Sequence, residues 1–173
     1  MFKKGSVGKE NDYWELEESD QKFPLQKRKI EGYFISLIFK VSVEKAREVI
    51  KKLKKEDFLN ENIMEIFLEM GKYLENRKTN INIKSFLNKF EGERKDLVSE
   101  LYMWDSEGKV EDEDSEKSTE KELDDIVDRI RKDSIKRQLQ ILSGEIKIAE
   151  TKKEDEELER LTKKFEKLSK SLL

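Results

Sequence analysis

Apolar residues recur three and four positions apart from Leu25 to Trp104, which is the pattern of helices that bury one face. Polar connections of two to eight residues separate these stripes. The pattern predicts about six short helices over residues 25–104, packed together as a compact helical bundle. The apolar positions that carry it are Ile30, Phe34, Leu37, Ile38, Val43, Ala46, Val49, Ile50, Leu53, Ile63, Ile66, Phe67, Met70, Leu74, Phe86, Leu87, Phe90, Leu97, Leu101 and Trp104.

Polar residues next to the stripes indicate where these helices start. Ser42 and Asn60 are expected to cap the helices that follow them, because their side chains can accept backbone N–H groups of the first turn. The turn at residues 56–58 is expected to place Phe58 inward. We assign the larger aromatic residues to the bundle core. They are Phe34, Phe67, Phe86, Phe90 and Trp104.

The pattern changes after Trp104. Residues 105–117 contain seven acidic residues and two lysines, which predicts a solvated linker. Thr119 and Glu122 have the spacing of a capping box, and a long helix is expected from about residue 119 to 150. Thr151 and Glu154 form a second such box. The helix that follows has a heptad-type seam, which predicts an antiparallel helical hairpin. Its seam positions are Leu158, Leu161, Phe165, Leu168 and Leu172.

The predicted fold class is therefore all-α, with a six-helix bundle followed by a long helix and a C-terminal antiparallel helical hairpin. The expected division is a tail or linker at residues 1–23, the bundle at 24–104, an acidic linker at 105–118 and the hairpin at 119–173. We expect the linker to let the hairpin swing relative to the bundle.

The amino-acid composition argues against several classes of function. Charged residues make up 45% of the chain and hydrophobic residues 35%, which suits helices that bury only one face. The chain has no His and no Cys, so it lacks thiolate nucleophiles, imidazole bases and Cys/His zinc ligands. Asp112, Glu113 and Asp114 lack the spacing of a cation-binding loop. We therefore expect no catalytic residues, no cofactor and no metal.

Charge and hydropathy bear on partners and location. The net charge of −3 gives no reason to expect nucleic-acid binding. The basic residues of the long helix alternate with aspartates, which is typical of a solvated face. No segment reads as a signal peptide or a membrane span, so we expect a cytoplasmic monomer that does not contact a membrane. The basic residues concerned are Arg129, Arg131, Lys132, Lys136 and Arg137.

The predicted hairpin has more apolar surface than one seam can bury. Ile141 and Ile148 lie off the stripe of Leu139, Leu142 and Ile146, and the chain ends on two leucines. Surplus apolar surface of this kind favours a partner-binding site, and docking back on the bundle is the alternative.

This order of parts resembles the C-terminal helicase-binding domain of bacterial DNA primase. One matching stretch is KIEGYFISLIFKVSVEKAREVIKKLKKEDFLNENIMEIFLEMGKYLE. The other is LDDIVDRIRKDSIKRQLQILSGEIKIAETKKEDEELERLTKKFEKLSKSLL, which is similar to the closing hairpin of that domain. The resemblance covers about residues 25–173 and is one of pattern. The zinc-binding and polymerase domains of a complete primase have no counterpart here.

The resemblance implies a partner, since primases of this family dock their terminal hairpin on the N-terminal collar of the replicative hexameric DNA helicase. Single-strand binding protein is a further candidate partner. Two alternatives stay open: the N-terminal domain of the helicase itself, which shares this fold, and a generic helical adaptor. The expected partner-binding residues are Ile141, Ile148, Phe165, Leu168, Lys170, Leu172 and Leu173.

Overall fold

The computed structural model describes residues 30–75, 77–79, 81–104 and 113–172, with side chains from residue 117 onward in the last range. These residues form helices and connections without any strand, which confirms the all-α prediction for them. The first helix is described over residues 30–38. The elements after it are α2 (Val43–Lys52), η1 (Lys55–Asp57), α3 (Glu61–Glu75), α4 (Ile83–Leu87), α5 (Glu93–Met103), α6 (Glu113–Lys152), α7 (Asp155–Ser169) and η2 (Lys170–Leu172).

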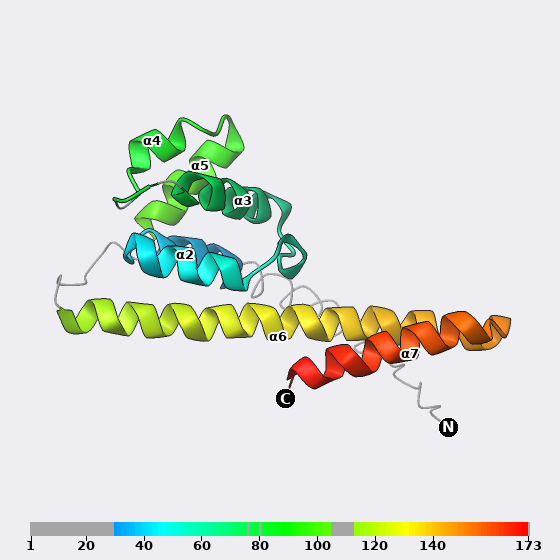
Figure 1. Cartoon of the computed structure of the whole chain (residues 1–173). Helices are drawn as coiled ribbons and strands as arrows, with labels where there is room; N and C mark the ends of the chain where they lie inside the picture. The colour runs from blue at the N-terminus through cyan, green and yellow to red at the C-terminus, as the bar shows by residue number, and fades with distance from the viewer. Residues whose placement is uncertain (1–29, 76, 80, 105–112, 173) are drawn as a thin grey trace, which may run out of the picture.

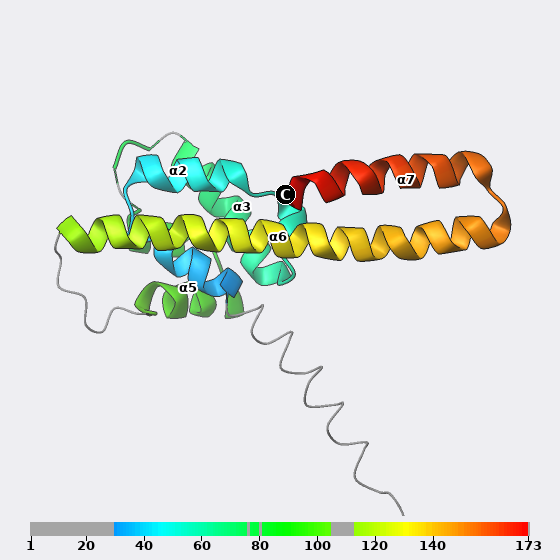
Figure 2. The same ribbon diagram turned by 90° about the horizontal axis from the view of Figure 1, so that it is seen from below.

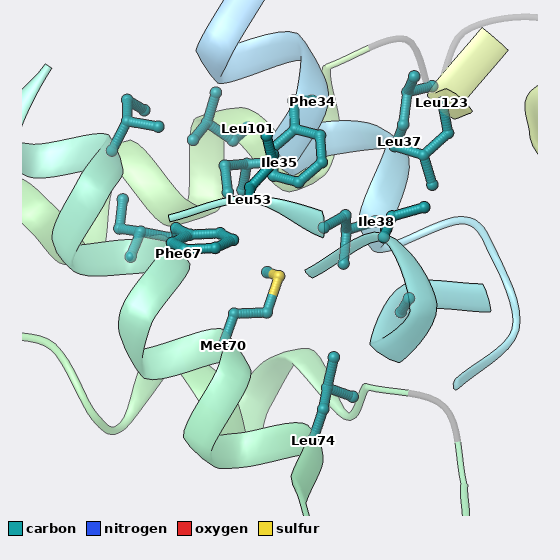
Figure 3. Packing of buried hydrophobic residues seen from close by; sticks show 14 of the residues in the cluster. Phe34, Ile35, Leu37, Ile38, Leu53, Phe67, Met70, Leu74, Leu101 and Leu123 are labelled. Atoms are coloured by element: carbon teal, nitrogen blue, oxygen red, sulfur yellow. The ribbon is translucent and has the colours of Figure 1, made fainter. Parts of the chain in front are cut away.

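The helices of residues 30–104, called the short helices below, lie together on one side of α6 (Figure 1). Their apolar faces meet in one core, where Phe34, Phe67 and Met70 converge (Figure 3). Phe34 is fully buried, and its ring lies 6.2 Å from the ring of Phe67. Phe58 is buried against the same rings, as the sequence predicts. Phe86 and Phe90 are buried as well.

The prediction that Trp104 belongs to this core is wrong. Its side chain is 40% exposed at the end of α5, where it packs edge-on against Tyr33 and covers Gly32. Because α5 ends at Met103, Trp104 takes an extended backbone and its ring lies on the surface of the first helix. Trp104 follows the apolar spacing of α5, but it lies just past the end of the helix and is therefore half exposed.

Helix starts agree with the sequence where a short polar side chain precedes the helix. The Ser42 hydroxyl accepts the Lys45 N–H, and the Asn60 Oδ1 atom accepts the N–H groups of Asn62 and Ile63. A distant residue completes the start of α3: the carboxylate of Glu31, buried in the first helix, accepts the Leu59 N–H at 2.7 Å and the Asn60 N–H at 2.9 Å. That contact ties the first helix to α3.

The long helix differs from its prediction at its start. It begins at Glu113, so part of the expected linker is helical, while residues 105–112 lie outside the described residues. Thr119 is buried inside α6 and does not cap it, and Glu122 accepts the Tyr33 hydroxyl at 2.8 Å. Leu123, Val127 and Ile130 are buried in the core of the short helices. The expectation that this helix swings relative to the short helices is therefore wrong for its first half.

Helix α6 ends at Lys152 and α7 begins at Asp155, close to the predicted helix start. The predicted capping box of Thr151 and Glu154 is not present. The Thr151 hydroxyl donates to the Lys147 carbonyl within α6, and Glu154 makes no side-chain cap. Instead Lys153 adopts a positive φ of 57°, and the Glu154 N–H donates to the Ala149 carbonyl at 3.1 Å. These are features of a helix that ends in a left-handed residue. From there α7 runs back along α6 (Figure 2).

Candidate partner-docking site

Helix α6 has two apolar faces, because it serves two different neighbours. Leu142, Ile146 and Ala149 face α7, where they pack with Leu161 and its neighbours. Leu123 and Val127, nearer the start of α6, face the short helices. At about 100° per residue, the two faces lie roughly 100° apart around the helix axis. A single helix thus joins two separate cores.

The face toward the short helices continues past the point where they end. Starting at Leu123, alternate steps of four and three residues lead through eight positions, a spacing that keeps them on one side of a helix. The first five are covered: the Ser134 hydroxyl donates to the Glu56 carbonyl, and the Arg137 guanidinium donates to the Asp57 carbonyl at 2.7 Å. The positions are Leu123, Val127, Ile130, Ser134, Arg137, Ile141, Gly144 and Ile148.

The last three positions are uncovered, and we call them the exposed α6 face. Ile141 is 62% exposed and Ile148 is 56% exposed, the largest such fractions of any aliphatic side chain on α6 among the described residues. Gly144 between them is also exposed, and a Cβ there would meet no atom within 4 Å. The face is therefore an apolar stripe with a flat centre, open to an approaching side chain.

The other predicted binding residues lie in different environments. Phe165 and Leu168 are half-buried in the core between α6 and α7, so they hold α7 in place and offer little surface. Leu172 is half-buried in η2, while Lys170 is exposed. Leu173 lies outside the described residues. The structure therefore brings Ile141 and Ile148 together on one face, and it does not place Phe165 and Leu168 beside them.

A line of basic residues, called the basic flank, runs along α6 on the side away from α7 and reaches the exposed α6 face at Lys147. Arg129, Lys136 and Lys147 are all exposed, and their spacing of seven and eleven residues places them along one line of the helix. Half-buried Asp133 lies between this line and the apolar stripe, and Glu145 lies on the opposite side, toward α7. From the sequence, Arg129 and Lys136 were interpreted only as part of a solvated face, and Lys147 was not considered. Their relation to Ile141 becomes visible once the two faces of α6 are separated.

A polar network holds the first half of α6 in position. Lys45 Nζ lies 2.5 Å from Asp124 Oδ2, and Lys52 Nζ lies 3.1 Å from Asp124 Oδ1 and 2.6 Å from a Glu48 oxygen. The hydrogen bond from Lys45 lowers the pKa of Asp124, and the same bond raises the pKa of Lys45. Both shifts favour the charged forms. The network fixes α2 against α6 and thereby fixes which face of α6 emerges beyond the short helices.

A second group of exposed apolar side chains lies at the end of α5. Tyr102 is 41% exposed and Met103 is 63% exposed, beside the half-exposed Trp104. The Tyr102 ring packs edge-on against Phe39 at 5.5 Å, so part of this group is anchored to the first helix. Residues 105–112 follow it directly, and they lie outside the described residues. The exposed α6 face is thus the better isolated of the two surfaces.

Within the part of the chain that the structure describes, no three acidic, His or Cys side chains are grouped to hold a metal ion. No helix there combines the length and the apolar composition needed to cross a membrane. The chain matches no protein-family model, no curated protein and no solved structure.

Proposed function

We propose that this chain is a protein-docking module whose exposed α6 face receives an apolar helix of a partner. The observation that carries the proposal is the exposure of Ile141 and Ile148 on the part of α6 that extends beyond the short helices. Exposed apolar side chains that share one face of a helix are a feature of interaction sites, whereas single scattered ones are common on any surface. Helix-in-groove recognition uses anchors at this spacing.

The specific form of the proposal is a helicase-binding module of a bacterial-type DNA primase. It rests on the resemblance of the sequence, which implies a six-helix bundle followed by a terminal hairpin. The partner would be the N-terminal collar of the replicative hexameric helicase, in the cytoplasm, and the module would position a primase during primer synthesis without catalysing it. Ile141, Ile148 and the exposed Lys170 would make contact, while Phe165 and Leu168 would keep α7 in place.

The test is calorimetry of the full chain with a replicative helicase hexamer. We expect Ile141→Asp combined with Ile148→Asp to weaken binding by about 30-fold or more, because buried anchor residues of an interface cost about 2 kcal/mol or more when lost. Met103→Asp is the matched control for each single substitution, since it places one aspartate at a side chain of similar exposure on α5. It should leave affinity unchanged.

Three outcomes would contradict the proposal in different ways. Wild-type protein that does not bind at about 50 µM helicase would exclude this partner at a useful affinity. Equal affinity of the double variant and the wild type would exclude the exposed α6 face as the contact. Light scattering that shows a ring of copies of this chain would favour the alternative of a helicase collar domain.

A further inference from the structure

The exposed α6 face lies beside the point where the N-terminal segment enters the fold. Ile30, the first described residue, lines a small pocket together with Ile130 and Arg137 of α6. Ile141 is the next position on that side of the helix, about 6 Å further along the axis at 1.5 Å per residue. Ile148 is roughly 16 Å from Arg137 by the same measure. The segment before Ile30 therefore starts next to the uncovered stripe.

The length of that segment is sufficient to reach the stripe. Residues 1–29 precede the described structure, and the chain between Trp14 and Ile30 spans up to about 50 Å when extended. This is several times the distance from Arg137 to Ile148. The reach requires no rearrangement of the short helices or of α7.

The composition of the segment fits the face and its flank. Residues 10–20 contain six acidic residues and no basic one, and the apolar Tyr13, Trp14 and Leu16 lie among them. The exposed α6 face offers apolar Ile141 and Ile148 with exposed Lys147 at its edge, and Arg129 and Lys136 continue the basic flank along α6 toward the point where the N-terminal segment enters. An acidic stretch with large apolar side chains is complementary to an apolar stripe with a basic border. Gly144 leaves a flat centre against which an aromatic ring can lie.

We infer that residues 10–20 of this chain dock in cis on the exposed α6 face, with Trp14 or Leu16 covering Ile141 and Ile148. The segment then shields the face in the free protein and competes with any partner that binds there. This inference concerns the chain itself and does not depend on the identity of that partner.

The test uses disulfide trapping in the full chain, which contains no cysteine of its own. One variant pairs Glu15→Cys with Glu145→Cys, next to the exposed face. Its matched control pairs Glu15→Cys with Lys132→Cys, an exposed position closer to the entry point but on the opposite side of α6. The tether before the first cysteine is the same in both pairs, and the second cysteine lies on opposite sides of α6, so docking on the exposed face favours only the pair at position 145. We expect the intramolecular disulfide at position 145 to form about tenfold faster.

A third variant adds Ile148→Asp to the position-145 pair and should lower its rate to that of the control. Equal rates for the two pairs, or a rate that Ile148→Asp does not change, would overturn the inference. Disulfide-linked dimers in place of the intramolecular product would overturn it as well, because the occupant would then be a second copy. Trapping is measured without helicase, so a failure to bind helicase in calorimetry would leave cis docking standing, and equal trapping rates would leave helicase binding to be decided by calorimetry.

Discussion

Leu123→Ala tests whether the first half of α6 belongs to the core of the short helices. Leu123 is fully buried in that core, although it lies 20 positions after Met103, the last residue of α5. The substitution removes three carbon atoms, worth roughly 2.4 kcal/mol at about 0.8 kcal/mol each. The cavity that remains raises the expected loss of unfolding free energy to about 3–4 kcal/mol.

The assay is urea denaturation followed by far-ultraviolet circular dichroism and, separately, by tryptophan fluorescence, which includes Trp104 beside the first helix. We expect both signals to report one transition, shifted to lower urea by the same amount. Leu59→Ala is the matched control, since it removes the same three carbon atoms from a side chain that is 50% exposed, and it should change stability by about 1 kcal/mol or less. A loss below about 1 kcal/mol for Leu123→Ala, or an unchanged fluorescence transition, would refute the shared core.

Three further changes test the polar contacts and one turn. Glu31→Gln should cost about 1–3 kcal/mol, because the buried carboxylate accepts two backbone N–H groups at the start of α3; urea titration measures it. The pKa of Asp124 is lowered by Lys45, so its stabilisation is present above the ordinary carboxylate value of 3.8 and is lost as pH falls through the lower folded value. Asp124→Asn should thus destabilise by under about 1 kcal/mol at pH 7 and by progressively less as the pH falls below 3.8, and an effect that does not change with pH would contradict this assignment. Gly92→Ala should lower thermal stability by about 1–3 kcal/mol, because Gly92 has a φ of 56° that alanine disfavours; an unchanged melting temperature would show that the turn adapts.

Local patterns in the sequence were sufficient to predict most of the helices and the residues at which several of them start. Ser42 and Asn60 act on N–H groups within three residues, so their roles could be inferred without knowledge of the fold. Glu31 could not be identified in this way, because the N–H groups it accepts lie 28 and 29 residues away. Thr119 was predicted from a local pattern to cap α6, and that prediction is wrong. Its spacing to Glu122 suits a cap, but α6 begins six residues earlier at Glu113, so Thr119 lies inside the helix.

The candidate site could be predicted only in part. Ile141 and Ile148 were singled out because they leave the stripe that faces α7, and the structure shows why: they continue the face that Leu123 and Val127 use toward the short helices. Periodicity alone cannot show where one neighbour stops covering a helix. Phe165 and Leu168 are a different case: their heptad spacing predicts the seam with α6, where the structure has them, and this conflicts with their expected role as partner-binding residues.

The central claim is that the exposed α6 face contacts the partner. The most direct measurement is a methyl NMR titration of the full chain, with labelled isoleucine δ1 methyl groups, against the unlabelled N-terminal domain of a replicative helicase. The account predicts that the signals of Ile141 and Ile148 shift or broaden, while those of the buried Ile63 and Ile66 do not change. Binding that leaves the Ile141 and Ile148 signals unchanged would contradict it.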